Sequence, residues 1–489
     1  MSSWKKKTAL SRLALACSMA IAAQAAVAAT NDISGTTYET YVHDPIAYSN
    51  HVGYTGYVGW DHDADGYYNG NIYPVINKSV VNGVISTYYL DDGVDGTANT
   101  LNISNSTVHG MITSQCMTSE CTDGDYVRDY YQDTLQLTVD NSTIDDTYEH
   151  YDYDVTTDGV RDHDVVDTYK YGNAITLDQE ANVVIQNNSH VAGITLTQGY
   201  YWPDDVTNNP EIFTDTLTVK DSVVTSGAYS ELGNTGFYGQ SNKPSDYAGT
   251  NDAGNDDAAL IVTASHSDNA MQTTATFDHS TLTGDVLFSS VFDNNFDPVG
   301  HDSNGDGVKD TNGWDDQDSL NLTLTNGSKW VGAAMSDVER TNTLYDYSPN
   351  SLWPTDEFNA DGDLTSASVY QSGLFNVTLD NASEWDTRKS SNIDTLTINN
   401  GSQVNVVNSS LLADSITLNN GSSMQIGDSN SAGTTIPDTT GYNDGVATDS
   451  LNINSGSQVK LTEETAALYA NTITVTNGGE LNLGLGQTD

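Results

Sequence analysis

Oxygen-bearing residues at alternating positions make residues 302–310 the clearest candidate for metal chemistry in this sequence. A calcium loop uses such spacing to donate carboxylate, amide and carbonyl oxygens, and its glycine allows the sharp turn between them. Side-chain oxygens would come from Asp302, Asn304, Asp306 and Asp310, and Val308 would contribute its backbone carbonyl. The bidentate acid expected at the twelfth place is missing, because Gly313 stands there. We therefore predict Ca²⁺ binding here, with a plain solvated acidic loop as the alternative.

A second candidate calcium loop lies closer to the N-terminus. Asp61, Asp63 and Asp65, followed by Gly66, repeat the first half of the same ligand pattern. No acid stands at its twelfth place, and in so acidic a chain some matches of spacing arise by chance. The alternative for this segment is again a solvated turn.

Residues for covalent catalysis are harder to find. No serine has a G-x-S-x-G or G-D-S-G context, so nucleophilic serine chemistry is not predicted. A polysaccharide lyase would need an arginine base near a metal site. Arg161 does lie among Asp158, Asp162 and Asp164, but a locally neutralising ion pair explains this grouping better. We predict no enzyme, no catalytic residue and no organic cofactor.

The N-terminus has the organisation of a secretory signal peptide, which we place at residues 1–28. An apolar run follows a positive segment and ends in an A-x-A site at Ala26 and Ala28. The positive charges belong to Lys5, Lys6, Lys7 and Arg12. The alternatives are an uncleaved anchor helix and a lipoprotein signal at Cys17. No later stretch is apolar for long enough to cross a membrane as a helix.

Export also determines the redox environment of the cysteines. Cys17 leaves with the signal, and Cys116 and Cys121 remain at C-x₄-C spacing. Because exported proteins meet an oxidising compartment, we predict a small local disulfide between this pair. Two free thiols are the alternative.

The charge balance excludes some partners. The chain has 16 lysines and arginines against 67 aspartates and glutamates, and loss of the signal takes its net charge from −51 to −55. Such a charge repels nucleic-acid phosphates and anionic lipid head groups. A nucleic-acid partner is therefore not expected.

A short repeat organises the mature chain. Each copy is an alternating strand, then residues rich in Asn, Asp and Gly, then a serine and an apolar residue two places later. The serines are Ser79, Ser106, Ser142, Ser189, Ser222, Ser280, Ser328, Ser383, Ser402, Ser422 and Ser457, and Gly479 replaces the serine in a last copy. The final copies lie 19, 20, 35 and 22 residues apart, which is the size of one turn of a parallel β-helix.

We therefore predict an all-β fold, a right-handed parallel β-helix with long acidic insertions. Inward Leu, Ile and Val would stack into one core, while outward Thr, Asn and Ser would meet water. After the signal, we expect a Tyr-rich cap with the first rungs (29–100), rungs with long insertions (101–382) and regular rungs (383–489). Candidate insertions are 145–167, 200–211, 230–257, 294–318 and 337–366. The alternative is a series of β-sandwiches with coincidental Asn-Gly turns.

The signal, the repeat and the acidity together resemble the passengers of AIDA-type autotransporters, the enterobacterial self-associating and biofilm adhesins. Residues 29–35, 57–60 and 83–93 carry the resemblance most clearly and are most similar to the EhaA-like kind. The resemblance implies a β-helical passenger on the outer surface that promotes cell–cell aggregation and adhesion. The translocating β-barrel of such proteins is not found, because the sequence is still repeat-like at residues 485–489.

From these features we expect a surface-displayed adhesin acting through repeated polar contacts of its solenoid. Its partner would be a second copy, or a host or matrix ligand such as a glycan. It would lie at the cell surface, in the outer membrane or outside the cell, or in the periplasm if no barrel is supplied. The alternative is a carbohydrate-binding or carbohydrate-cleaving β-helix.

Overall fold

A computed structural model describes the chain in a series of segments. They are residues 33–34, 37–39, 75–86, 99–114, 134–155, 161–170, 173–177, 179–197, 212–227, 258–264, 270–290, 318–336, 374–387, 391–407, 409–427, 445–462 and 466–483. All regular structure in these segments is β-strand.

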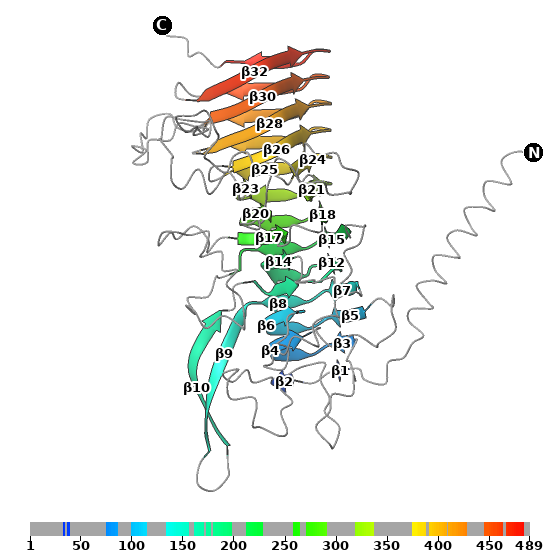
Figure 1. Ribbon diagram of the computed structural model, residues 1–489, viewed down its shortest axis with the longest axis vertical. Coiled ribbons are helices and arrows are strands. Elements are labelled where there is room, and N and C mark those ends of the chain that lie inside the picture. Colours follow the sequence, from blue (N-terminus) through cyan, green and yellow to red (C-terminus); the bar gives the residue numbers. More distant parts are fainter. Residues whose placement is uncertain are drawn as a thin grey trace, which may run out of the picture.

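The strands stack into one long parallel solenoid (Figure 1). Its first face is a 13-stranded sheet in which every neighbouring pair is parallel. The strands, in order along the sheet, are β1 (Ile33–Ser34), β3 (Val75–Asn77), β5 (Asn99–Ser104), β7 (Leu135–Asp140), β12 (Ala181–Gln186), β15 (Ile212–Lys220), β18 (Ala270–Asp278), β21 (Ser319–Thr325), β24 (Leu374–Leu379), β26 (Ser391–Ile398), β28 (Ser410–Leu418), β30 (Gly445–Ile453) and β32 (Ala467–Val475).

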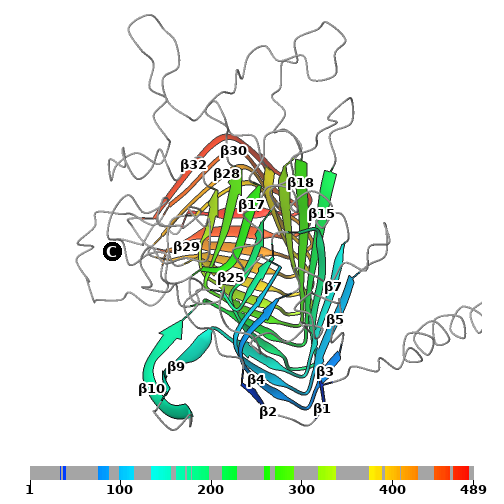
Figure 2. The same ribbon diagram turned by 60° about the horizontal axis from the view of Figure 1, so that its bottom comes forward.

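A second face runs beside the first along the whole solenoid (Figure 2). Its parallel strands are β2 (Thr37–Glu39), β4 (Val80–Ser86), β6 (Thr107–Thr113), β8 (Thr143–Asp145), β13 (His190–Ala192), β16 (Val223–Thr225), β19 (Thr281–Thr283), β22 (Lys329–Val331), β25 (Glu384–Thr387), β27 (Gln403–Val406), β29 (Ser423–Ile426), β31 (Gln458–Leu461) and β33 (Glu480–Asn482). One rung of the solenoid is thus a strand of the first face, a tight corner, and a strand of the second face.

A third, shorter face closes the middle of the solenoid. It consists of β11 (Ile175–Leu177), β14 (Ile194–Thr197), β17 (Ala258–Ala264), β20 (Asp285–Ser290) and β23 (Ala334–Ser336), and it joins the second face through β6. Its outward residues Ile261 and Leu287 are buried as well, and the partly buried Met335 packs with them. Strands that are apolar on both sides are typical of a sheet covered on both faces.

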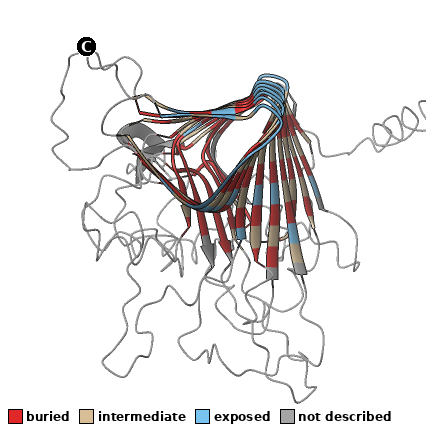
Figure 3. Ribbon diagram, turned by 90° about the horizontal axis from the view of Figure 1, so that it is seen from above, coloured by how far each residue is buried: buried red, intermediate tan, exposed pale blue. Residues whose placement is uncertain are grey.

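The core lies inside these faces (Figure 3). Burial alternates along the strands of the first face, as in β7, where Leu135, Leu137 and Val139 are buried and the residues between them are partly exposed. The apolar residue two places after each repeat serine is buried from Val81 to Val459, and Leu481 in the last rung packs partly buried against the core. Two of these residues, Trp330 and Trp385, stack with ring centroids 4.4 Å apart.

The parallel β-helix predicted from the repeat is confirmed. One of the predicted insertions, residues 145–167, largely forms an antiparallel hairpin outside the solenoid, β9 (Thr147–Val155) and β10 (Arg161–Lys170) (Figure 1). Within the described residues, no helix is long and apolar enough to span a membrane.

Candidate interaction surface

The serine that marks each repeat is buried and lies just after the corner between the first and second faces. In most rungs its backbone N–H donates to the hydroxyl of the serine one rung further on, as from Ser142 to Ser189 (3.1 Å) and from Ser189 to Ser222 (3.1 Å). In Ser328, Ser402 and Ser457 it donates to a carbonyl of its own corner instead. The hydroxyl in turn donates to a carbonyl of its own corner, which for Ser189 is that of Gln186 (2.6 Å). The serines therefore satisfy backbone groups inside the fold and leave no hydroxyl available for surface chemistry.

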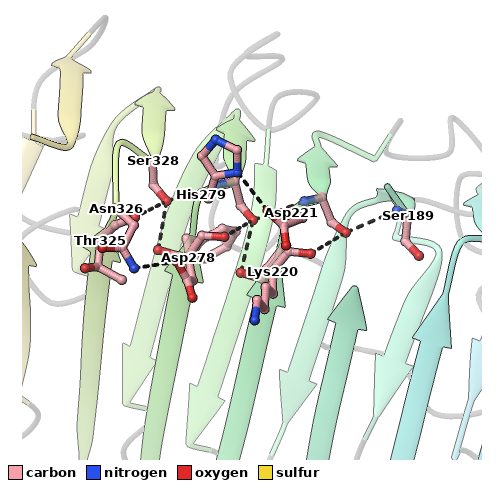
Figure 4. Close-up of polar contacts among 12 residues, drawn as sticks. Ser189, Lys220, Asp221, Asp278, His279, Thr325, Asn326 and Ser328 are labelled. Atoms are coloured by element: carbon pink, nitrogen blue, oxygen red, sulfur yellow. Dashed lines mark hydrogen bonds and ion pairs between the residues drawn. The ribbon is translucent and has the colours of Figure 1, made fainter. Parts of the chain in front are cut away.

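The corner itself is an exposed stack of residues with positive φ. Asn105, Asn141, Asn326, Asn400 and Asn420 all adopt this left-handed conformation, which asparagine tolerates better than most residues. Their amides bond along the solenoid axis, for example from Asn141 Nδ2 to Asn105 Oδ1 (2.8 Å). His279 takes the same place in another rung and pairs with Asp221 at 2.7 Å (Figure 4). The corner asparagines therefore form a ladder of their own, and it lies outside the serine ladder.

The middle of the outward side of the first face is an array of uncharged side chains, all of them polar except Val184. Two neighbouring columns run from β5 to β32, and every member is at least partly exposed. One column is Thr100, Gln136, Asn182, Thr216, Thr274, Asn321, Asn376, Thr395, Ser415, Ser450 and Thr472. The other is Asn102, Thr138, Val184, Thr218, Thr276, Thr323, Thr378, Thr397, Thr417, Asn452 and Thr474. We call these two columns the uncharged face.

Neighbouring rungs of the uncharged face are linked by hydrogen bonds between side chains. Asn376 donates to Asn321 (3.1 Å), and Thr395 donates to Asn376 (2.6 Å). Ser450 donates to Ser415 at 3.1 Å. These bonds hold the side chains in ordered rows. Since a hydroxyl accepts two hydrogen bonds as well as donating one, capacity for further contacts remains.

The second face differs in chemistry although it belongs to the same rungs. Its outward positions include the ion pair between Lys329 and Glu384 (3.3 Å) and the pair between His109 and Asp145 (2.8 Å). Lys460 and other charged residues lie on it as well. The absence of charge is therefore a property of the two columns of the uncharged face, in a chain with 67 acidic residues.

Several carboxylates lie inside the solenoid, and the sequence pattern did not reveal them. Asp215 Oδ1 accepts the N–H of Ala181 (2.7 Å), and Asp318 Oδ1 accepts that of Met271 (2.7 Å). Burial raises the pKa of Asp215 to about 7, against the lowering effect of the Ala181 bond, and the nearby charge of Glu180 adds to the increase. Their only sequence signal is an aspartate at an inward position of an alternating strand, as in Asp215 before Thr216 and Leu217.

Three other aspartates stack in consecutive C-terminal rungs, and of these Asp394 is buried while Asp414 and Asp449 are exposed. The strand register places Asp394 beside Asp414, and Asp414 beside Asp449. Burial raises the pKa of Asp394 to about 6, although the N–H of Phe375 donates to its carboxylate and opposes the shift; the charge of Asp414 adds to the rise. The pKa of Asp414 is raised by desolvation and by the charge of Asp449.

The metal and cysteine sites predicted from the sequence lie outside the described residues. This holds for the loop with Asp302, Asn304, Asp306, Val308 and Asp310, and for Asp61, Asp63 and Asp65. It also holds for Cys116 and Cys121. These sites stay predictions. In the part of the chain that is described, no group of three or more His, Cys, Asp or Glu residues is arranged to hold a metal ion.

Comparison with known families decides what kind of protein carries this solenoid. The family described as the N-terminal passenger repeat of autotransporter YaiT matches residues 10–388. The chain belongs to this family. The predicted autotransporter passenger is thereby confirmed, and members of the family are exported proteins of the bacterial surface or outer membrane.

Two curated relatives support the same assignment. The chain is 45% identical to the putative uncharacterized protein YaiT of Escherichia coli (strain K12), in an alignment that covers 100% of the chain and 53% of that protein. It is 44% identical to the uncharacterized protein YaiT of Salmonella typhimurium (strain LT2), with the same coverage. The chain thus spans about half the length of these relatives. No solved structure matches it.

Proposed function

We propose that this passenger is a surface-displayed adhesin that mediates cell–cell aggregation, adhesion and biofilm formation through contacts between solenoids. The observation that carries the proposal is the uncharged face. It gives an otherwise strongly acidic chain one long surface on which a second acidic chain can lie without direct charge repulsion.

Two copies of this face are well suited to each other. Hydroxyl and amide groups both donate and accept hydrogen bonds, so an array of them is complementary to itself. Both copies also repeat at the strand spacing of roughly 4.8 Å, so one match in register aligns the whole column. Each polar contact stabilises the pair only weakly, but contacts made together by one rigid rod add up.

Calcium belongs to this proposal as an aid to association. The acidic loops at 302–310 and 61–65 would bind the ion, lower the net charge of each rod and reduce repulsion between rods. We propose that the passenger acts by binding and not by catalysis.

Cell settling tests the proposed function. Cells that display the passenger on an autotransporter barrel are mixed with differently labelled cells that display only the barrel. We expect clumps that contain displaying cells and leave the others in suspension. Clumps that take up both labels equally would point to another ligand on every cell, such as a glycan. No clumping at all would contradict the proposal.

A further inference from the structure

A third column of side chains borders the uncharged face next to the corner. From β3 to β32 it consists of Asn77, Ser104, Asp140, Gln186, Lys220, Asp278, Thr325, Asp380, Asn399, Asn419, Asn454 and Thr476. We call it the border column. Unlike its two neighbours it carries charge, and Lys220 is its single cation.

The lysine and the acids of this column remain able to bind charged groups of another molecule. Lys220 is exposed and makes no ion pair with any residue that the structure describes, although Asp278 lies in the next rung (Figure 4). The acids are held in position from the corner of the next rung: Asp278 accepts a hydrogen bond from Asn326 (2.7 Å), and Asp380 accepts one from Asn400 (2.6 Å). Each carboxylate keeps lone pairs for a further partner.

The way that rods from two cells meet restricts their geometry. Rods that project from facing surfaces overlap in antiparallel directions. Two uncharged faces then pack about a two-fold axis that runs along the strands, so each column meets the same column of the other copy. Such an interface is isologous, and any contact between two different residues occurs twice. The one variable that remains is the register of the two rods, which is their relative shift along the solenoid axis in steps of one rung.

We infer that the ion pair between Lys220 of one copy and Asp380 of the second copy sets this register. It places the two-fold axis between β18 and β21, so that β15 faces β24 and β3 faces β32. All strands from β3 to β32 then overlap. Asp278 faces Thr325 and Asp140 faces Asn419, so no two acids of the border column meet. The inference rests on the proposed self-association.

Neighbouring registers bring like charges together. A shift by one rung in one direction sets Asp278 against Asp278 of the other copy. A shift in the opposite direction sets Asp278 against Asp380. Both also lose the two ion pairs with Lys220. Like-charge contacts at an interface exclude wrong arrangements more effectively than attractive pairs favour the right one.

The opposite border of the uncharged face is compatible with the same register of the two copies. There Glu180, at the start of β12, would face the first residues of β26 in the second copy. These are Ser391, Asn392 and Ile393, which carry no charge, and the acid that follows them, Asp394, is buried. Both borders are therefore compatible with this arrangement.

A charge exchange tests the inference. Lys220→Asp and Asp380→Lys are made singly and together in the full chain, and self-association is measured by sedimentation. Each single variant sets like charges against each other twice, so we expect its dissociation constant to rise about tenfold or more. The double variant restores the pair in reverse and should regain wild-type association. Lys329→Asp with Glu384→Lys, the same exchange on the second face, is the control and should change nothing.

Zero-length amine–carboxyl cross-linking gives an independent readout. Within one chain Lys220 and Asp380 lie three rungs apart, roughly 14 Å at the usual strand spacing, which is too far for such a bond. A cross-linked peptide joining them is therefore expected only from associated copies. If the wild-type chain associates but the single variants bind as tightly and no such peptide forms, the register inference is wrong. If the wild-type chain stays monomeric and its cells do not settle, the proposed function is wrong as well.

Discussion

At the scale of single residues, the buried aspartates link the stability of the solenoid to pH. Asp215 has a pKa of about 7 in the folded chain, compared with 3.8 in the absence of burial. The unfolded chain therefore binds fewer protons at this site than the folded chain, and the stability that the neutral form provides is lost as the pH rises through 7. Mild acid should consequently stabilise this part of the solenoid.

The variant Asp215→Asn tests this link. It keeps an oxygen to accept the Ala181 N–H and removes the titration. We expect the free energy of unfolding of the wild type, relative to the variant, to increase by about 3 kcal/mol between pH 8 and pH 5. Urea unfolding of both proteins at several pH values measures the difference. A constant difference across this range would mean that Asp215 does not titrate there.

The serine ladder gives a second prediction at this scale. Ser189→Ala removes the acceptor of the Ser142 N–H in a buried place. A buried donor without a partner costs about 1–3 kcal/mol, so the variant should unfold at a correspondingly lower urea concentration. Ser423→Ala, on the partly exposed side of β29, is the control and should stay within about 0.5 kcal/mol of the wild type. Equal effects of the two variants would count against a structural role for the ladder.

At the scale of elements, the stacked tryptophans show why some repeats need a glycine. Trp385 Nε1 donates to the carbonyl of Gly332 (2.9 Å), and Trp330 Nε1 donates to that of Gly284 (2.9 Å). A Cβ on Gly332 would lie 2.0 Å from the Gly284 oxygen. The rungs therefore approach each other too closely here for any side chain.

Two glycine variants separate this crowding from simple backbone strain. Gly332→Ala should destabilise the chain by more than about 3 kcal/mol, because neighbouring backbone has to move. Gly401→Ala adds a Cβ with nothing within 4 Å at a φ of +74°, so only backbone strain of about 1 kcal/mol is expected. Thermal unfolding of both variants compares the two effects, and a milder effect at Gly332 would contradict the packing.

The elements also show what the sequence could and could not predict. The spacing of serine and apolar residue predicted the rungs, because Val81, Val108 and their successors must be buried for a rung to be stable. The role of the serine was not predictable, since its hydrogen bonds join residues far apart in the chain, such as Ser222 and Ser280, which are 58 residues apart. The outward Thr, Asn and Ser were predicted, but not that they form a surface without charge, because this becomes evident only when Thr276 and Thr323, far apart in the chain, stack side by side.

At the scale of the whole molecule, net charge opposes the association that the uncharged face permits. With a formal charge of −51, two rods repel each other at low ionic strength. Salt screens this repulsion beyond a distance of about 8–10 Å, so we expect settling of displaying cells to increase from low to physiological salt, and further with calcium. Settling that was strongest in low salt with a chelator would show that attraction between charges dominates instead.

The most direct test of the central claim compares charged variants of the two faces within one rung. Thr274→Asp with Thr276→Asp places two acids on the uncharged face in β18, and Thr281→Asp with Thr283→Asp places two acids on the second face in β19. The net charge of the two proteins is the same. Sedimentation of the purified chains should show that the first variant fails to associate and the second associates like the wild type. Equal association of both variants would contradict the claim that the uncharged face is the adhesive surface.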